Sequence, residues 1–242
     1  MLPTPVEGPV GPDDAAFLPR MRMTLYAPGQ PVTEPVAKLG GSPVWLTEPA
    51  WPVSPTSGEP LMFIGQFPVP VAAGEVARLA YLFLEEDSLF MGGLDGPDEE
   101  PGDAALIVQP GGRVRPGVRI GPPGITGPTL WTDAVEQVPV EWLVDLAPFD
   151  PRTEEAIEQY VGWSNGERGE PDVWSDDPRD WLAGRPLYPN FAVVGRPWRF
   201  FFQLHDLEGT LDDPYFLNFG GGTGHAYLST DGLEGIFVWQ GA

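Results

Sequence analysis

The sequence predicts an α+β protein, mostly β, in which antiparallel sheets are joined by many turns and accompanied by few short helices. Two observations predict this class: 31 Gly and 31 Pro among 242 residues, and a hydrophobic fraction of 42%. Gly and Pro both disfavour the interior of a helix, so this composition favours short strands and turns. A chain of this length can also bury a sizeable core.

Eight segments have the alternation or the aromatic and β-branched content that is typical of strands. They are residues 44–46, 61–67, 79–84, 104–109, 191–194, 198–204, 226–229 and 235–240. A helix is expected from Pro151 to Gly162, because Asp150 can cap its first turn and Pro151 suits the first helical position. A second, short helical turn is expected at 140–146.

The chain is expected to divide into an N-terminal covering segment and one domain. Residues 1–36 are rich in Pro and polar residues and should wrap the surface of a domain at 37–242. Within that domain, residues 164–185 should form a long surface excursion that Trp174 and Trp181 anchor. The acidic run at 95–100 is expected to be a solvated loop.

An internal similarity suggests that the domain is built from two similar halves. Residues 60–67 and 197–204 share the pattern P-x-x-F-x-x-Q followed by an apolar residue, and Ala-Tyr-Leu recurs at 80–82 and 226–228. The two offsets, 137 and 146 residues, are similar. Internal duplication is one explanation, and chance similarity of short aromatic strands is the other.

The charge balance limits the possible partners. The chain has 35 Asp and Glu against 13 Lys and Arg, which gives a formal net charge of −22. Such a surface repels phosphates, so nucleic acid and anionic membrane surfaces are not expected as partners. If the charge selects a partner, a basic protein is favoured; the favoured interpretation of the charge is solubility alone, with partner selection as the alternative.

The cellular location of the protein is inferred from three features that the sequence lacks. It has no Cys, so a disulfide framework and a thiol nucleophile are both excluded. No stretch reaches the ~20 apolar residues of a membrane helix, and the first residues lack the features of a secretion signal. A cytoplasmic protein is therefore expected.

Histidine is the first candidate for catalytic chemistry, because it changes charge near neutral pH, and the chain has two, His205 and His225. His205 with Asp206 could supply a general base and its carboxylate, but adjacent strand residues point to opposite faces. An acidic loop is the favoured interpretation of this segment. No nucleophile motif is present, and the glycine-rich run 219–224 lacks the Lys of a phosphate-binding loop. We assign no catalytic residue, cofactor or metal, and a protein without enzymatic activity is favoured.

The most informative stretch lies at 38–67. Gly40-Gly41 permits a tight turn, Pro43 stiffens its exit, and Trp45 and Trp51 offer large apolar surfaces that can anchor the loop to the core. On physical grounds alone, an ordinary Pro-rich loop with two buried tryptophans is the favoured interpretation, and a binding site is the alternative.

This stretch resembles the YwqG-like family, a bacterial domain of unknown function. The resemblance rests on G-G-x-P-x-W at 40–45, W-P at 51–52 and S-P-x-S-G-x-P-x-x-F-x-x-Q at 54–66, with further family-like residues at 218–222 and 235–240. More distantly, the chain is similar to the programmed-cell-death-protein-two-like group, which the resemblance links to chaperoning of a ribosomal protein.

One departure from the family pattern concerns metal binding. Ser54 and Ser57 stand where many relatives carry a pair of Cys. Neutral hydroxyls cannot replace thiolates as zinc ligands, so a zinc knuckle is not expected. Instead, these hydroxyls are expected to accept hydrogen bonds from local amides.

Two functions are therefore expected from the sequence. The first is a non-enzymatic protein-interaction or client-holding module, chaperone-like or toxin-neutralising, that uses an acidic surface. The second is a small-molecule-binding protein or hydrolase near Gln203, His205 and Asp206. The candidate binding residues are Trp45, Gln66, Gln203, His205 and Asp206. Gln66 and Gln203 would be equivalent in a duplicated chain, each placed to cap an edge or to satisfy a buried backbone group.

Overall fold

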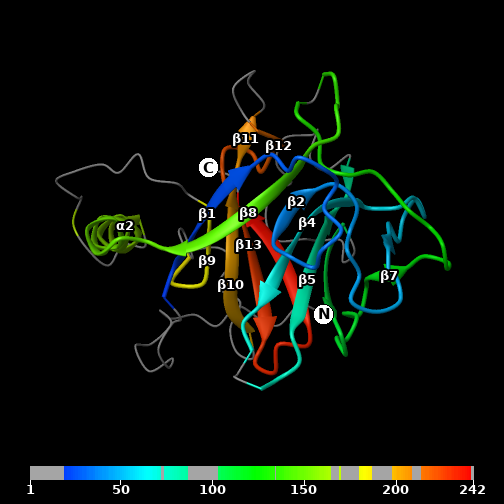
Figure 1. The fold of residues 1–242 in the computed structure, drawn as a ribbon, viewed down its shortest axis with the longest axis horizontal. Helices are drawn as coiled ribbons and strands as arrows, with labels where there is room; N and C mark the ends of the chain where they lie inside the picture. The colour runs from blue at the N-terminus through cyan, green and yellow to red at the C-terminus, as the bar shows by residue number, and fades with distance from the viewer. Residues whose placement is uncertain are drawn as a thin grey trace.

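The computed structural model describes residues 19–71, 74–86, 103–133, 135–164, 169, 180–186, 198–208 and 214–240. This part of the chain is mostly β, as predicted, with one helix, α2 (Pro151–Ser164) (Figure 1). The strands are β1 (Met21–Tyr26), β2 (Lys38–Gly40), β3 (Pro52–Val53), β4 (Met62–Val69), β5 (Arg78–Leu84), β6 (Ala104–Gln109), β7 (Arg119–Ile120), β8 (Glu141–Pro148), β9 (Trp181–Leu182), β10 (Trp198–His205), β11 (Leu207–Glu208), β12 (Phe216–Leu217), β13 (Thr223–Ser229) and β14 (Gly235–Gln240).

Ten strands form one antiparallel sheet in the order β14-β13-β10-β9-β1-β8-β2-β4-β5-β6. Two small ribbons, β11-β12 and β3-β7, lie outside it. The order is symmetrical about the central pair β1 and β8. A short strand comes next on each side, β2 on one and β9 on the other. Beyond it lie three longer strands, β4-β5-β6 (the first meander) and β10-β13-β14 (the second meander). The strand predictions at 61–67, 79–84, 104–109, 198–204, 226–229 and 235–240 are confirmed to within a few residues, and 191–194 lies outside the described residues.

The sheet is rolled so that its two edge strands, β6 and β14, lie against each other. Gly235 permits this contact, because a Cβ at that position would come within 2.6 Å of Leu106 Cδ2. The main core fills the inside of the roll, where the rings of Phe67 and Phe202, from β4 and β10, lie 4.1 Å apart. The two edges therefore face each other, although no backbone ladder joins them among the described residues.

The centre of the sheet corrects two predictions. Met21–Tyr26 falls in the expected covering segment but forms β1, which pairs with β8 and β9. The helical turn expected at 140–146 is wrong, because this segment forms β8. Trp142, Val144 and Leu146 alternate toward the main core, and tertiary pairing with β1 and β2 decides the conformation.

Helix α2 begins as predicted and ends two residues later than expected. The Asp150 carboxylate accepts hydrogen bonds from the amides of Arg152 and Thr153, both at 3.1 Å. These bonds lower the pKa of Asp150, and the largest contribution comes from the Thr153 hydroxyl. The capped helix packs Ile157 and Val161 in a small core with Phe149 and Trp181.

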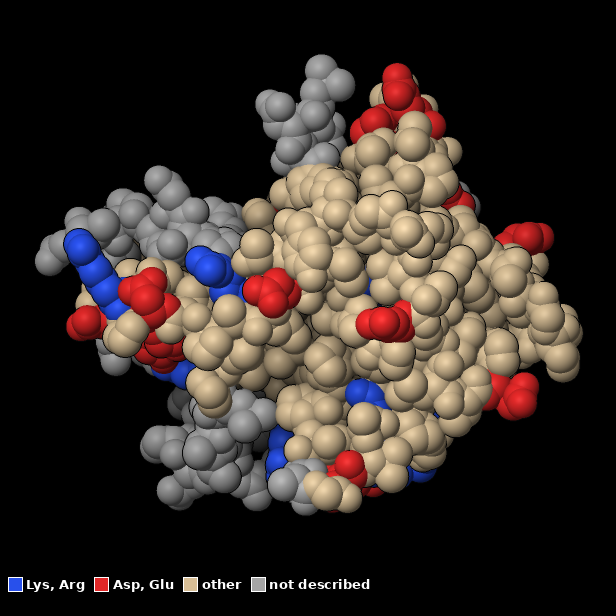
Figure 2. Space-filling model, in the orientation of Figure 1, with Lys and Arg blue, Asp and Glu red and all other residues tan. Residues whose placement is uncertain are grey.

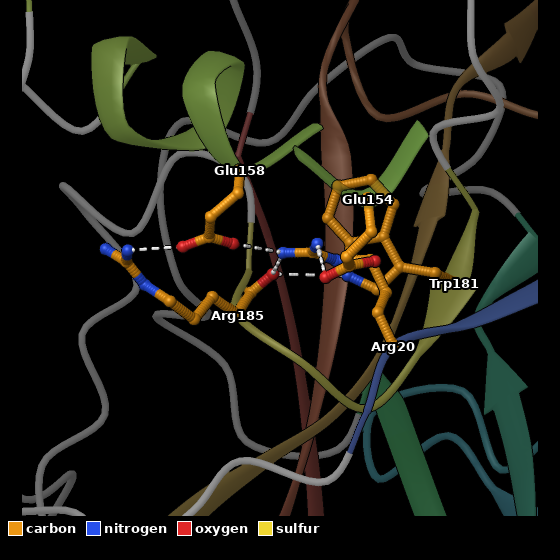
Figure 3. A network of polar contacts seen from close by, with 5 residues as sticks. All are labelled: Arg20, Glu154, Glu158, Trp181 and Arg185. Carbon is orange, nitrogen blue, oxygen red and sulfur yellow. Dashed lines mark hydrogen bonds and ion pairs between the residues drawn. The ribbon is translucent and has the colours of Figure 1, made fainter. Parts of the chain in front are cut away.

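A buried arginine ties α2 to the sheet (Figure 3). The side chain of Arg20 is fully buried and pairs with Glu154 at 2.5 Å and with Glu158 at 3.0 Å. Its guanidinium also lies 4.8 Å from the ring centroid of Trp181, so the predicted anchoring by this tryptophan is confirmed. Trp174 lies outside the described residues. Burial raises the pKa of Glu154, whereas Arg20 and Arg185 outweigh burial at Glu158 and lower its pKa.

The two meanders correspond in local detail. The β4-β5 ladder shifts register between Phe63 and Gly65, and the β10-β13 ladder shifts between Phe200 and Phe202, which is the same place in the shared pattern. Positive φ angles follow β2 and β9 alike, at 40–41 and at 183–184. These correspondences extend the similarity seen in the sequence, while duplication itself stays a prediction.

The contact between β6 and β14 makes a stability prediction. A Gly235→Ala substitution should lower the free energy of unfolding by about 1–3 kcal/mol, because the new methyl group overlaps the Leu106 side chain. Gly29→Ala is the matched control, since nothing lies within 4 Å of a Cβ there, and it should change the value by less than about 0.5 kcal/mol. Urea denaturation of both variants measures this, and equal values would argue against a rolled sheet.

Candidate functional site

Three polar side chains stand in a row across the outer face of β4, β5 and β6 and bind the backbone of the loop at 42–48. Gln66 Oε1 accepts a hydrogen bond from the Val44 amide (2.9 Å), and its Nε2 donates to the Val36 carbonyl (2.8 Å). The Tyr81 hydroxyl donates to the Val44 carbonyl (2.9 Å) and accepts from the Leu46 amide (3.0 Å).

Gln109 completes this row at the edge of the sheet. Its Oε1 accepts from the Thr47 amide (3.1 Å), and its Nε2 donates to the Glu48 carbonyl (2.8 Å). The strand predicted at 44–46 is therefore wrong for a physical reason: side chains, and no neighbouring strand, satisfy its backbone. Burial raises the pKa of Tyr81 to about 12, although the Leu46 amide acts in the opposite direction, so the hydroxyl remains protonated.

Trp45 closes this layer as an anchor. Its ring lies 4.6 Å from Tyr81 and 6.0 Å from Phe83, and Trp51 donates its indole N–H to the Leu61 carbonyl (2.8 Å). The predicted anchoring role of both tryptophans is confirmed. Trp45 and Gln66, two candidate binding residues, thus hold the loop in place, and Gln66 satisfies buried backbone groups as predicted.

A buried ion pair shapes the turn that leads into the loop. Lys38 is fully buried, and its ammonium group binds Glu141 Oε1 (2.6 Å) and the Ser42 carbonyl (2.5 Å). Gly40 and Gly41 have φ angles of 66° and 63°. A Cβ on Gly41 would lie 2.2 Å from Glu141, so glycine is required here for both conformation and space.

Ser54 and Ser57 take the predicted role of binding local amides. Ser54 Oγ accepts from the amides of Thr56 (3.3 Å) and Ser57 (3.2 Å), and Ser57 Oγ accepts from the Glu59 amide (3.2 Å). The turn is thus closed by hydroxyl groups.

The second group of candidate residues lies at the end of β10. Gln203 pairs with His225 of β13 in the ladder, and both are fully buried. The same register places Tyr81 opposite Gln66, so His225 takes the position of Tyr81. The sequence pattern instead aligned Tyr81 with Tyr227, two residues away.

His205 and Asp206 engage different partners. The backbone amide of His205 donates a hydrogen bond to Asp180 Oδ1 (2.5 Å). The other oxygen of this carboxylate, Oδ2, accepts a hydrogen bond from the Tyr215 hydroxyl (3.1 Å). Asp206 Oδ2 accepts from the amides of Phe219 (2.9 Å) and Gly221 (2.7 Å). Asp206 therefore holds the glycine-rich turn between β12 and β13, as expected for a turn between strands.

Asp180 and Tyr215 are site residues that the sequence did not reveal. Burial raises the pKa of Asp180 to about 6, against the two hydrogen bonds that favour its ionised form. A carboxyl that titrates near neutral pH is a feature of many functional sites. No spacing pattern signals Asp180, because it lies far in sequence from the residues that surround it.

The described residues form neither a metal site nor a membrane-spanning helix. Among residues that the structure describes, no three His, Asp or Glu side chains are arranged to hold a metal ion. The helix α2, with 14 residues, is too short to cross a bilayer, and no other described segment is a membrane-spanning helix.

Comparison with protein-family models, with curated proteins and with solved structures finds no significant match. The YwqG-like resemblance therefore stays a prediction.

The polar row makes a second stability prediction. Tyr81→Phe should lower the free energy of unfolding by about 1–3 kcal/mol, because the Val44 carbonyl and the Leu46 amide lose their buried partner. Hydrogen exchange at the Leu46 amide should become faster. Tyr26→Phe, at a side chain that is half exposed, is the control. An unchanged exchange rate at Leu46 would contradict the role of the row.

Asp180 makes a prediction about pH. A raised pKa means that the folded state binds the proton more tightly, so the stabilisation is present below about pH 4 and is lost as pH rises through about 6. Asp180→Asn should therefore match the wild type near pH 4 and exceed it at pH 7.5, by on the order of 1–3 kcal/mol. Urea denaturation at both pH values tests this, and a constant difference across the range would refute it.

Proposed function

We propose that this protein is a non-enzymatic interaction module that holds a basic polypeptide through its acidic surface. The observation that carries the proposal is the excess of carboxylates, 35 against 13 basic residues. Opposite charges raise the rate of encounter and disfavour wrong partners, so this excess favours a partner rich in Lys and Arg.

Many of the basic side chains are not available to a partner. Five basic side chains are already engaged in ion pairs with carboxylates of the same chain, namely Arg20, Lys38, Arg78, Arg113 and Arg185. Two of them, Arg20 and Lys38, are completely buried. Their cationic groups are enclosed, each beside a carboxylate that it neutralises.

Acidic groups also gather where β5 ends. Trp131 donates its indole N–H to Glu86 (3.3 Å), which brings the end of β5 beside the hairpin that carries Asp133 and Glu136. None of the ion pairs between described residues includes these three carboxylates. Figure 2 shows acidic side chains at the top of the view, along the margin and at isolated places nearer the centre, on a face that is mostly uncharged and carries some basic side chains at the left and bottom.

The alternative function, a small-molecule site or hydrolase at Gln203, His205 and Asp206, has less support. Catalysis by an acid-base pair needs the carboxylate to orient the imidazole, and Asp206 instead binds two amides of the glycine-rich turn. Its position is explained by the turn that it holds.

Calorimetric titration with a 20-residue oligolysine tests the proposal. We expect saturable binding with a fixed stoichiometry near 50 mM salt, which is lost near 0.5 M, while oligoglutamate does not bind. Diffuse binding without a fixed stoichiometry, or none at all, would show that the charge serves solubility.

Charge position can be separated from total charge with two matched variants. Replacement of Glu86, Asp133 and Glu136 by their amides should weaken oligolysine binding about tenfold, because the removed charges lie together. The same replacement of Glu34, Glu48 and Glu59 removes equal charge elsewhere and should have a smaller effect. Equal losses in both variants would contradict binding at the end of β5.

A further inference from the structure

The hairpin formed by residues 131–133 and 135–140, here called the tip, presents apolar side chains to water. Val135 is 91% exposed and Val138 is 49% exposed. Single exposed apolar residues are normal on a protein surface. Here two of them belong to one hairpin: Val135 lies between Asp133 and Glu136 in sequence, and Val138 follows two residues after Glu136.

Hydrogen bonds link the described residues of the tip to one another. The Asp133 carboxylate accepts from the amides of Val135 and Glu136, both at 2.8 Å. The Thr132 amide donates to the Val138 carbonyl (2.9 Å), and Gln137 adopts a positive φ of 50° that closes the turn. These bonds restrict the described residues of the tip before a partner binds, which lowers the conformational entropy that they lose on binding.

The base of the tip is fixed to the core. Trp131 is buried, its ring lies 5.0 Å from that of Phe216, and its carbonyl accepts the Phe216 amide (2.9 Å). The Val140 amide donates to the Leu130 carbonyl (2.9 Å). The exposed valines thus stand on a rigid support, which is the arrangement that favours contact residues of an interface.

A carboxylate with a lowered pKa lies beside the valines. The amides of Glu136 and Val135 lower the pKa of Asp133, so its carboxylate stays ionised even in mild acid. An apolar contact bordered by fixed negative charge is complementary to an apolar pocket bordered by Lys or Arg.

We infer that the tip is the contact element for the basic polypeptide, with Val135 and Val138 inserted into an apolar site that Lys or Arg side chains of the partner surround. This inference rests on the proposed function and deepens it, because it adds an apolar requirement to a partner otherwise defined by charge. A purely cationic chain should then bind more weakly than one of equal charge that also carries apolar residues.

Two synthetic peptides of equal length and charge test the inference, one with Lys and Ser and one with Lys and Leu. We expect the full chain to bind the Lys-Leu peptide about tenfold more tightly, since burying a valine-sized surface contributes about that factor. Val135→Ser combined with Val138→Ser should abolish this preference and leave binding of the Lys-Ser peptide unchanged. Val76→Ser with Val114→Ser, two exposed valines elsewhere, should keep the preference.

The outcomes separate the two proposals. If neither peptide binds the wild type, the proposed function fails. If both bind but the tip variant keeps the full preference for Lys-Leu, the proposed function stands and the assignment of the tip is overturned. Circular dichroism and thermal unfolding of each variant verify that the fold is retained, which substitutions at exposed positions are expected to allow.

Discussion

Lys38 is buried completely, so its charge has to be satisfied inside the protein. Glu141 and the carbonyl of Ser42 do this, and the geometry of that pairing fixes the turn at Gly40-Gly41. This turn directs the chain so that the loop at 42–48 crosses the outer face of the sheet. Removal of one partner of such a pair leaves an uncompensated buried charge, which is far more costly than the pair is stabilising. The path of the loop at 42–48, which covers β4, β5 and β6, therefore depends on this ion pair.

Much of the fold follows from local sequence, and the exceptions have a common cause. Residues 104–109 and 235–240 are apolar along their length and bounded by turn residues, so their strands are predicted to the residue. In contrast, β1 and β8 form the centre of the sheet and were assigned to a covering segment and a helical turn. Their half-exposed faces give a weak apolar pattern, and pairing between residues that lie more than a hundred positions apart decides their conformation.

The candidate site was less predictable than the fold. The anchoring roles of Trp45 and Gln66 follow from residue type and position, whereas their partner Gln109 is separated from the loop by more than sixty residues. A further similarity was missed as well: K-L-G-G-S-P at 38–43 corresponds to W-L-A-G-R-P at 181–186, and both carry positive φ angles. Ala in place of Gly hides the pattern in the sequence, although the backbone retains it.

The burial of Lys38 has a chemical consequence, because this chain contains no other lysine. Acylation, isopeptide ligation and amine-directed cross-linking all require an accessible, unprotonated ε-amino group. In the folded protein that group is enclosed and ion-paired, so reagents of this kind meet no reactive side chain. Modification of Lys38 would accordingly report on opening of the turn at Gly40-Gly41, and its rate would measure how often the loop at 42–48 separates from the strands that it covers.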